Sequence, residues 1–279
     1  MTQTKSSAAP FHKIAVATDF AAATSAHAVA LASTIATICA AELMVVHVVE
    51  SAAYPQIGPD TAALRRIGLG TLDAAVIRIR DDVPGARGVL LVGHPAEEVV
   101  TFAEKNAIDL VVSGTHGRQS VERWLLGSVA EKIVRSCHAP VLTVHDEARA
   151  FRRLLVATDF GPSSERAVEL AARMATTFGA RLTLVHVVGD DVPVDAAGKR
   201  LEEVAAGIRY LAPECDVLVR QGTAWSELTH EAEKGDYDLV ILGTHGRKAL
   251  PQWLLGGVAE KVVRSSLPPV LTVRAPDAG

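Results

Sequence analysis

Two nearly identical stretches, Gly114-Thr115-His116-Gly117 and Gly243-Thr244-His245-Gly246, organise the sequence. Each follows a short apolar run, at residues 110–113 and 239–242, and after nine intervening residues a further glycine precedes an amphipathic segment. A glycine loop lets backbone N–H groups approach an anion closely, and a helix start adds unpaired N–H groups and the positive end of its dipole. The pattern therefore predicts two phosphate sites, each between a buried strand and a helix.

The two stretches belong to a repeat that covers the chain. The matching segments 14–20 and 154–160 lie 140 residues apart (158 − 18), whereas the downstream glycines, Gly127 and Gly256, lie 129 apart (256 − 127). The second half therefore lacks about eleven residues between its second and third strands (140 − 129). A repeat of this length is a duplicated domain. We predict domains at 1–148 and 149–279.

The sequence pattern in each half predicts alternating strands and helices. In the first half, apolar or β-branched runs predict strands at 14–18, 43–49, 89–92, 110–113 and 141–144, and helices at 25–40, 61–82, from Pro95 and from Val129. We expect Thr24 or Ser25 to lie near the N-cap of the first helix. Short apolar strands separated by helices indicate an α/β fold with a parallel sheet covered on both faces, in which ligands bind beyond the carboxyl ends of the strands.

Composition restricts the class of protein. The chain has 279 residues, 49% of them hydrophobic and 22% charged, which is typical of folded α/β domains. A net charge of −4 gives no support for a nucleic-acid surface. The three scattered cysteines predict buried thiols rather than disulfides or a zinc site. No export signal or membrane span is evident, so we expect a cytoplasmic protein without membrane contact.

The glycine pattern, Gly-x-x-Gly followed after nine residues by Gly-Ser, resembles the motif of the universal stress protein family. Asp19 after the first strand and His47-Val48 late in the second belong to the same resemblance, which covers essentially the whole chain. The resemblance implies two tandem, open five-stranded parallel sheets, Rossmann-like and similar to adenine nucleotide alpha-hydrolases, in strand order 3-2-1-4-5. It also implies binding of ATP, with Mg near Asp19, in stress response or signalling to a partner that the sequence does not name. Pairing through the fifth strands, 141–144 and 270–273, would give a pseudo-dimer within one chain or a homodimer.

The resemblance assigns site residues in each half. In the first half, residues near the base, ribose and phosphates would be Ala17, Thr18, Asp19, Val48, Ser113, Gly114, His116, Gly117, Gly127, Ser128 and Val129, with Arg118 just beyond the loop. The corresponding second site comprises Ala157, Thr158, Asp159, Val187, Leu242, Gly243, His245, Gly246, Gly256, Gly257 and Val258. Because Gly257 stands where the family has Ser or Thr, we expect the first domain to be the stronger ATP site.

Several of these residues also have a structural interpretation. Ser128 and Glu131 match a capping box, and an aspartate after a strand commonly starts the next helix. Arg118 and Arg247 would contact phosphate or be solvated surface residues, and the histidines at 47 and 186 are predicted to be hydrogen-bonded core residues. No nucleophile–base pair and no metal-ligand spacing is present, so we predict no catalytic residue and no metal site from the protein alone. Slow ATP hydrolysis and a nucleotide-free scaffold stay as alternatives.

Overall fold

The computed structural model describes residues 9–20, 22–50, 61–115, 126–146, 151–190, 193–244 and 255–275. The chain divides into two compact units, one built mainly from residues 11–148 and the other mainly from residues 149–251 and 256–279. We call them the first and the second domain, and each is described by itself.

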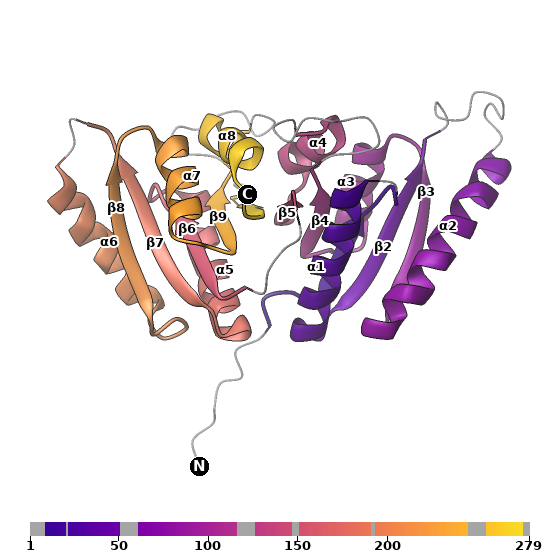
Figure 1. The fold of residues 1–279 in the computed structure, drawn as a ribbon, viewed down its shortest axis with the longest axis horizontal. Helices are drawn as coiled ribbons and strands as arrows, with labels where there is room; N and C mark the ends of the chain where they lie inside the picture. Colours follow the sequence, from indigo (N-terminus) through magenta and orange to yellow (C-terminus); the bar gives the residue numbers. More distant parts are fainter. Residues whose placement is uncertain are drawn as a thin grey trace, which may run out of the picture. The chain divides into compact units, whose positions relative to one another are not determined.

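The first domain is a parallel sheet with helices on both faces (Figure 1). The elements in chain order are β1 (Lys13–Ala17), α1 (Ala23–Cys39), β2 (Glu42–Val49), α2 (Thr61–Asp82), β3 (Arg87–Val92), α3 (Pro95–Lys105), β4 (Leu110–Gly114), α4 (Ser128–Ser136) and β5 (Val141–Val144). The strand order is β3-β2-β1-β4-β5 and every pairing is parallel, which confirms the predicted order 3-2-1-4-5. Helix α1 packs on α2, and α3 packs on α4.

The second domain repeats this arrangement (Figure 1). Its elements are β6 (Arg153–Ala157), α5 (Pro162–Phe178), β7 (Arg181–Val188), α6 (Val194–Ile208), β8 (Cys215–Gln221), α7 (Ala224–Lys234), β9 (Leu239–Gly243), α8 (Gly257–Ser265) and β10 (Val270–Val273). The order is β8-β7-β6-β9-β10, again with parallel pairs. The predicted α/β class with two tandem sheets is therefore confirmed.

The central strands hold each core. Ile14 and Val16 of β1 and Leu110 and Val111 of β4 are fully buried, because helices cover both faces of the sheet. None of the helices in the described ranges combines the length and the apolar character that crossing a bilayer requires.

The start of α1 differs from the prediction. The helix begins at Ala23, with Ala22 as its N-cap residue, and neither Thr24 nor Ser25 caps it. The reason is that Asp19 accepts hydrogen bonds from the Ala22 amide (3.2 Å) and the Ser25 hydroxyl (2.8 Å), which starts the helix two residues earlier. The helix ends at Cys39, and Ala40 follows in the left-handed region (φ 52°).

Helix α2 forms over the predicted residues although Gly68 and Gly70 lie in its middle. A Cβ atom at Gly68 would lie 2.6 Å from both Leu90 Cδ1 and Val49 Cγ2. Gly68 therefore allows α2 to approach β2 and β3 closely, and this packing offsets the poor helix propensity of glycine.

Candidate functional site

A cavity of about 720 Å³ lies at the carboxyl ends of β6, β7 and β9 in the second domain. It brings together nine of the residues predicted for the second site: Ala157, Thr158, Asp159, Val187, Leu242, Gly243, Gly256, Gly257 and Val258. The remaining two, His245 and Gly246, lie outside the described residues. The volume falls in the range of small-molecule pockets.

The cavity also contains residues that the sequence did not assign to a site. Phe160, Ser164 and Arg200 line it, as does His186, which was predicted only as a core histidine. Phe160 had a usable signal, because both halves contain Thr-Asp-Phe after their first strand. Arg200 had none, since an arginine within an amphipathic helix is an ordinary surface residue.

The Thr-Asp-Phe segment makes a tight turn at the end of β6. Phe160 has a φ of 62°, in the left-handed region that bulky residues rarely adopt. Its amide donates to Thr158 Oγ1 (3.0 Å), and the Asp159 carboxylate accepts from the Gly161 amide (3.0 Å) and the Ser164 hydroxyl (2.8 Å). Asp159 thus holds the start of α5, which is the structural role considered for it.

The first domain has the same turn after β1. Phe20 has a φ of 56°, and its amide donates to Thr18 Oγ1 (3.0 Å). Asp19 holds the start of α1 as Asp159 holds that of α5. The two aspartates therefore share a structural role in addition to any contact with a ligand.

The two histidines near the carboxyl ends of the second strands, β2 and β7, fix that turn. His47 Nδ1 lies 2.9 Å from the Thr18 carbonyl, and His186 Nδ1 lies 2.6 Å from the Thr158 carbonyl. Because a carbonyl oxygen only accepts, Nδ1 carries the proton in both rings. His47 is buried, as predicted, whereas His186 is half-buried and faces the cavity.

Both glycine loops are closed at their base by a backbone hydrogen bond. The amide of Gly127 donates to the Thr115 carbonyl (2.7 Å), and that of Gly256 to the Thr244 carbonyl (2.8 Å). Each bond holds the first turn of α4 or α8 next to the end of the preceding strand. In the second domain this brings residues 256–259 to the cavity wall, where helix-start amides can meet an anion.

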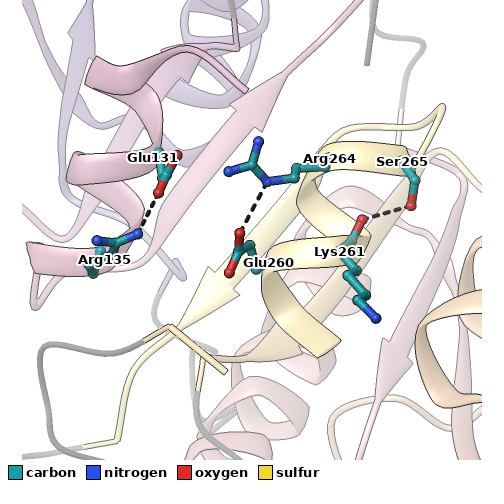
Figure 2. A network of polar contacts seen from close by, with 6 residues as sticks. All are labelled: Glu131, Arg135, Glu260, Lys261, Arg264 and Ser265. Atoms are coloured by element: carbon teal, nitrogen blue, oxygen red, sulfur yellow. Dashed lines mark hydrogen bonds and ion pairs between the residues drawn. The ribbon is translucent and has the colours of Figure 1, made fainter. Parts of the chain in front are cut away.

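The capping-box prediction for Ser128 is wrong. The N-cap residue of α4 is Gly127 and makes no side-chain capping bond, while Ser128 is the first helical residue. Glu131 instead pairs with Arg135 one turn on, as Figure 2 shows, and Glu260 pairs with Arg264 in α8 (3.3 Å). The exposed Ser128 hydroxyl makes no hydrogen bond with another described residue.

Helix packing explains two glycines of the motif but does not explain Gly257. A Cβ at Gly114 would lie 2.8 Å from the carbonyl carbon of Thr24, and one at Gly243 would lie 2.7 Å from Ser163 Cβ. Packing of α1 and α5 therefore requires both glycines. Around Gly257 no atom lies within 4 Å of such a Cβ, so packing does not explain that glycine.

In the first domain, the described site residues lie on neighbouring strands. Ala17 of β1 pairs with Val46 of β2 and with Ser113 of β4, so the ends carrying Thr18, Val48 and Gly114 share one edge of the sheet. His116, Gly117 and Arg118, like Arg247 in the second domain, lie outside the described residues. Within the described ranges, no group of three His, Cys, Asp or Glu residues is placed to hold a metal ion.

The family model described as "Universal stress protein family" matches residues 10–145 and 150–274. Universal stress protein Rv1996 of Mycobacterium tuberculosis is 31% identical over 191 residues, which cover 61% of this chain and only 60% of that relative. Universal stress protein Rv2005c of the same organism is 28% identical over 260 residues, covering 83% of this chain and 87% of the relative. The crystal structure of a universal stress protein from Archaeoglobus fulgidus has the same fold, with a TM-score of 0.78, 21% identity, and coverage of 94% of this chain and 98% of that one.

Proposed function

Because the chain belongs to the universal stress protein family, we propose that it is a tandem stress-response protein that binds ATP in at least one domain. The observation that carries the proposal is the second-domain cavity. Nine residues that the family resemblance had assigned to nucleotide contact line it together. Its apolar middle and its helix-start amides suit a nucleoside with a phosphate at one end.

The first domain is the stronger ATP site in this proposal. Ser128 adds a hydroxyl at the first position of α4, and no capping bond occupies it. The Gly127 amide is already bonded to the Thr115 carbonyl (2.7 Å), so the amides left for an anion are those of the first turn of α4. The second domain keeps the amides but has no hydroxyl at Gly257, so its affinity for the same phosphate is lower.

Magnesium would arrive with the nucleotide. Asp19 is the acidic residue at the end of β1, and its Oδ1 atom already accepts two hydrogen bonds within the chain. A carboxylate of this kind suits an ion that keeps most of its ligands as water and phosphate oxygens. The metal would neutralise phosphate charge there, while the protein positions the nucleotide. Any hydrolysis would be slow, because the sequence contains no Walker-type P-loop lysine.

A nucleotide-free scaffold is the second candidate. It is favoured by Gly114 and Gly243, for which helix packing alone gives a sufficient reason. On this alternative the repeated glycines would serve helix packing within each domain, and the loops would bind nothing.

Ligand analysis by mass spectrometry separates the two candidates. Protein purified under native conditions is denatured and the released small molecules are identified, for the natural chain and for the Gly127→Val and Gly256→Val variants. We expect ATP from the natural chain and less of it from Gly127→Val, with Gly256→Val reducing the remainder. Absence of nucleotide, together with no thermal shift on adding ATP and magnesium, would support the scaffold. Nucleotide content unchanged in both variants would remove the glycine-loop assignment.

Pairing and partners belong to the same proposal. Strands β5 and β10 end the strand orders of their domains, and we propose them as pairing strands within one chain or between two. Sedimentation equilibrium of the full chain distinguishes a monomer from a homodimer. A signalling partner that responds to nucleotide occupancy would be sought by comparing binding partners with and without ATP.

A further inference from the structure

Arg200 is the cation in the described wall of the second-domain cavity. It lies on α6, and its Cζ atom stands 4.3 Å from the centroid of the Phe160 ring. Phe160 in turn contacts His186, with ring centroids 4.5 Å apart. Arg200 makes no hydrogen bond or ion pair with another described residue. The aromatic face thus holds a guanidinium at the cavity without using its N–H donors.

The first domain has no charge at the corresponding position. The offset of 129 that relates the two glycine loops matches Arg200 with Thr71 (200 − 129). The register is supported by the next residues, Leu201 and Leu72, which are both fully buried. The Phe20–His47 contact is kept in the first domain, with centroids 5.2 Å apart. Arg200 is therefore an addition to one domain rather than part of the shared turn.

Two positively polarised groups face the cavity from opposite sides of β6. Arg200 belongs to α6, which packs on β7 and β8, whereas the first turn of α8 follows β9. Strand β6 pairs with β7 on one side and with β9 on the other. Apolar residues also line the cavity, among them Val185 and Val187 of β7 and Leu242 of β9.

The acidic group of the cavity is Asp159, whose Oδ1 atom is held by Gly161 and Ser164. A guanidinium that stacks by its face retains in-plane donors suited to phosphate or carboxylate oxygens. An apolar middle with a donor group at each side fits a ligand with two separated anions.

We propose that Arg200 recognises a second anionic group of the ligand, so that the second-domain cavity selects nucleotides phosphorylated at two separate positions. The proposal rests on nucleotide binding by this cavity and adds the group that sets its specificity. Thr71 gives the first domain no such preference.

Isothermal titration calorimetry of the full chain tests the proposal with two probes, adenosine 5′-monophosphate and adenosine 3′,5′-bisphosphate. We expect the bisphosphate to bind one site about tenfold more tightly than the monophosphate, the usual gain from a charge-assisted hydrogen bond. Arg200→Gln should remove this preference, so that the two probes bind with equal affinity. Lys199→Gln is the matched control, because Lys199 is exposed, adjacent and outside the cavity wall.

The possible results distinguish failure of the specificity role of Arg200 from failure of nucleotide binding itself. Equal affinity of the natural chain for both probes, or a preference that survives Arg200→Gln, overturns the role of Arg200 while leaving nucleotide binding in place. Loss of binding of both probes in Arg200→Gln, with an unchanged circular dichroism spectrum, also overturns the specificity role. If neither probe binds the natural chain, this inference fails, and titration of the same protein with ATP and magnesium then shows whether the proposed function fails with it. Introducing Thr71→Arg should create the preference in the first domain.

Discussion

Gly257 begins helix α8 at the position where Ser128 begins helix α4, so one loop–helix junction has a hydroxyl group and the other does not. Both helices have a glycine N-cap in the same extended conformation, and both loops close with the same backbone hydrogen bond. The two junctions thus differ at a single side chain within an otherwise shared geometry.

Gly257→Ser is expected to strengthen nucleotide binding by the second domain. The added Cβ has no neighbour within 4 Å, so the side chain fits without rearrangement. One hydrogen bond from the added hydroxyl to a charged phosphate oxygen would increase affinity by about tenfold. Calorimetry with ATP and magnesium measures the change. Gly257→Ala is the control, because it adds the Cβ without the hydroxyl, and equal affinities for the two variants would contradict the prediction.

Gly114→Ala and Gly243→Ala are expected to destabilise their domains by about 1–3 kcal/mol. In each case the new Cβ would lie within 2.9 Å of backbone atoms, of Thr24 for Gly114 and of Ser163 and Ser164 for Gly243, and backbone cannot move aside cheaply. Urea denaturation followed by circular dichroism measures the loss.

Gly70→Ala provides the comparison for these variants. Gly70 also lies in a regular element, but a Cβ there would meet nothing within 4 Å. We expect it to stabilise α2 by about 0.5–1 kcal/mol. If Gly114→Ala were as stable as Gly70→Ala, packing would not explain the first glycine of the motif.

The α/β class and the two tandem domains could be predicted from the residues themselves, because continuous apolar strands, alternating helices and the offset of the two halves are local and repeated signals. The strand order came only from the resemblance to a known family, since these signals do not say which strands are neighbours. Helix starts were less predictable. The position of Ala22 depends on a hydrogen bond to the side chain of Asp19, three residues earlier, and that of Ser128 on the bond that closes the glycine loop between Gly127 and Thr115.

The candidate site was predictable only in its repeated part. Thr158, Asp159 and Gly243 have counterparts in the first half, and the structure places them at one cavity. Arg200 has no charged counterpart in the first half, and its position relative to β6 depends on how α6 packs in the folded domain. Its contact with Phe160 could not be derived from spacing, because residues 160 and 200 are joined only through the packing of α6 on β7.

Arg220→Met is expected to destabilise the second domain by roughly 2 kcal/mol. Arg220 of β8 donates two hydrogen bonds to the Glu231 carboxylate of α7 (2.9 and 2.6 Å), and the Glu231 side chain is only 10% exposed. Removing the guanidinium leaves that carboxylate buried and unpaired, while methionine keeps most of the apolar stem. Thermal and urea unfolding measure the loss.

Arg209→Met is the matched control for that ion pair. Arg209 pairs with Glu202 at 3.0 Å, but both side chains are about half exposed (48% and 52%), so we expect a change of about 0.5 kcal/mol or less. The offset of 129 aligns Arg220 and Glu231 in sequence with Leu91 and Phe102 of the first half (220 − 129 and 231 − 129). If Arg220→Met lowers the free energy of unfolding no more than Arg209→Met does, the burial of Glu231 does not add to the stabilising effect of its ion pair.

Cys39 and Cys215 are expected to react slowly with iodoacetamide in the folded protein. Burial raises the pKa of each thiol to about 11, and both side chains are buried in their domains. Since the thiolate is the reactive form, a raised pKa lowers the reactive fraction at pH 8 to roughly one in a thousand. Mass spectrometry of the digested peptides should show labelling that continues to rise from pH 9 towards pH 11.

The same reaction in 6–8 M urea, roughly the range that unfolds most domains, supplies the control. There the thiols regain an ordinary pKa, so labelling at pH 8 should be on the order of a hundredfold faster and should level off near pH 9. Labelling of the folded chain that levels off at the same pH as the unfolded chain would mean that the two thiols are solvated. Because the shift arises from burial in each domain, Cys39 and Cys215 should respond alike, and a difference between them would identify the domain that opens more readily.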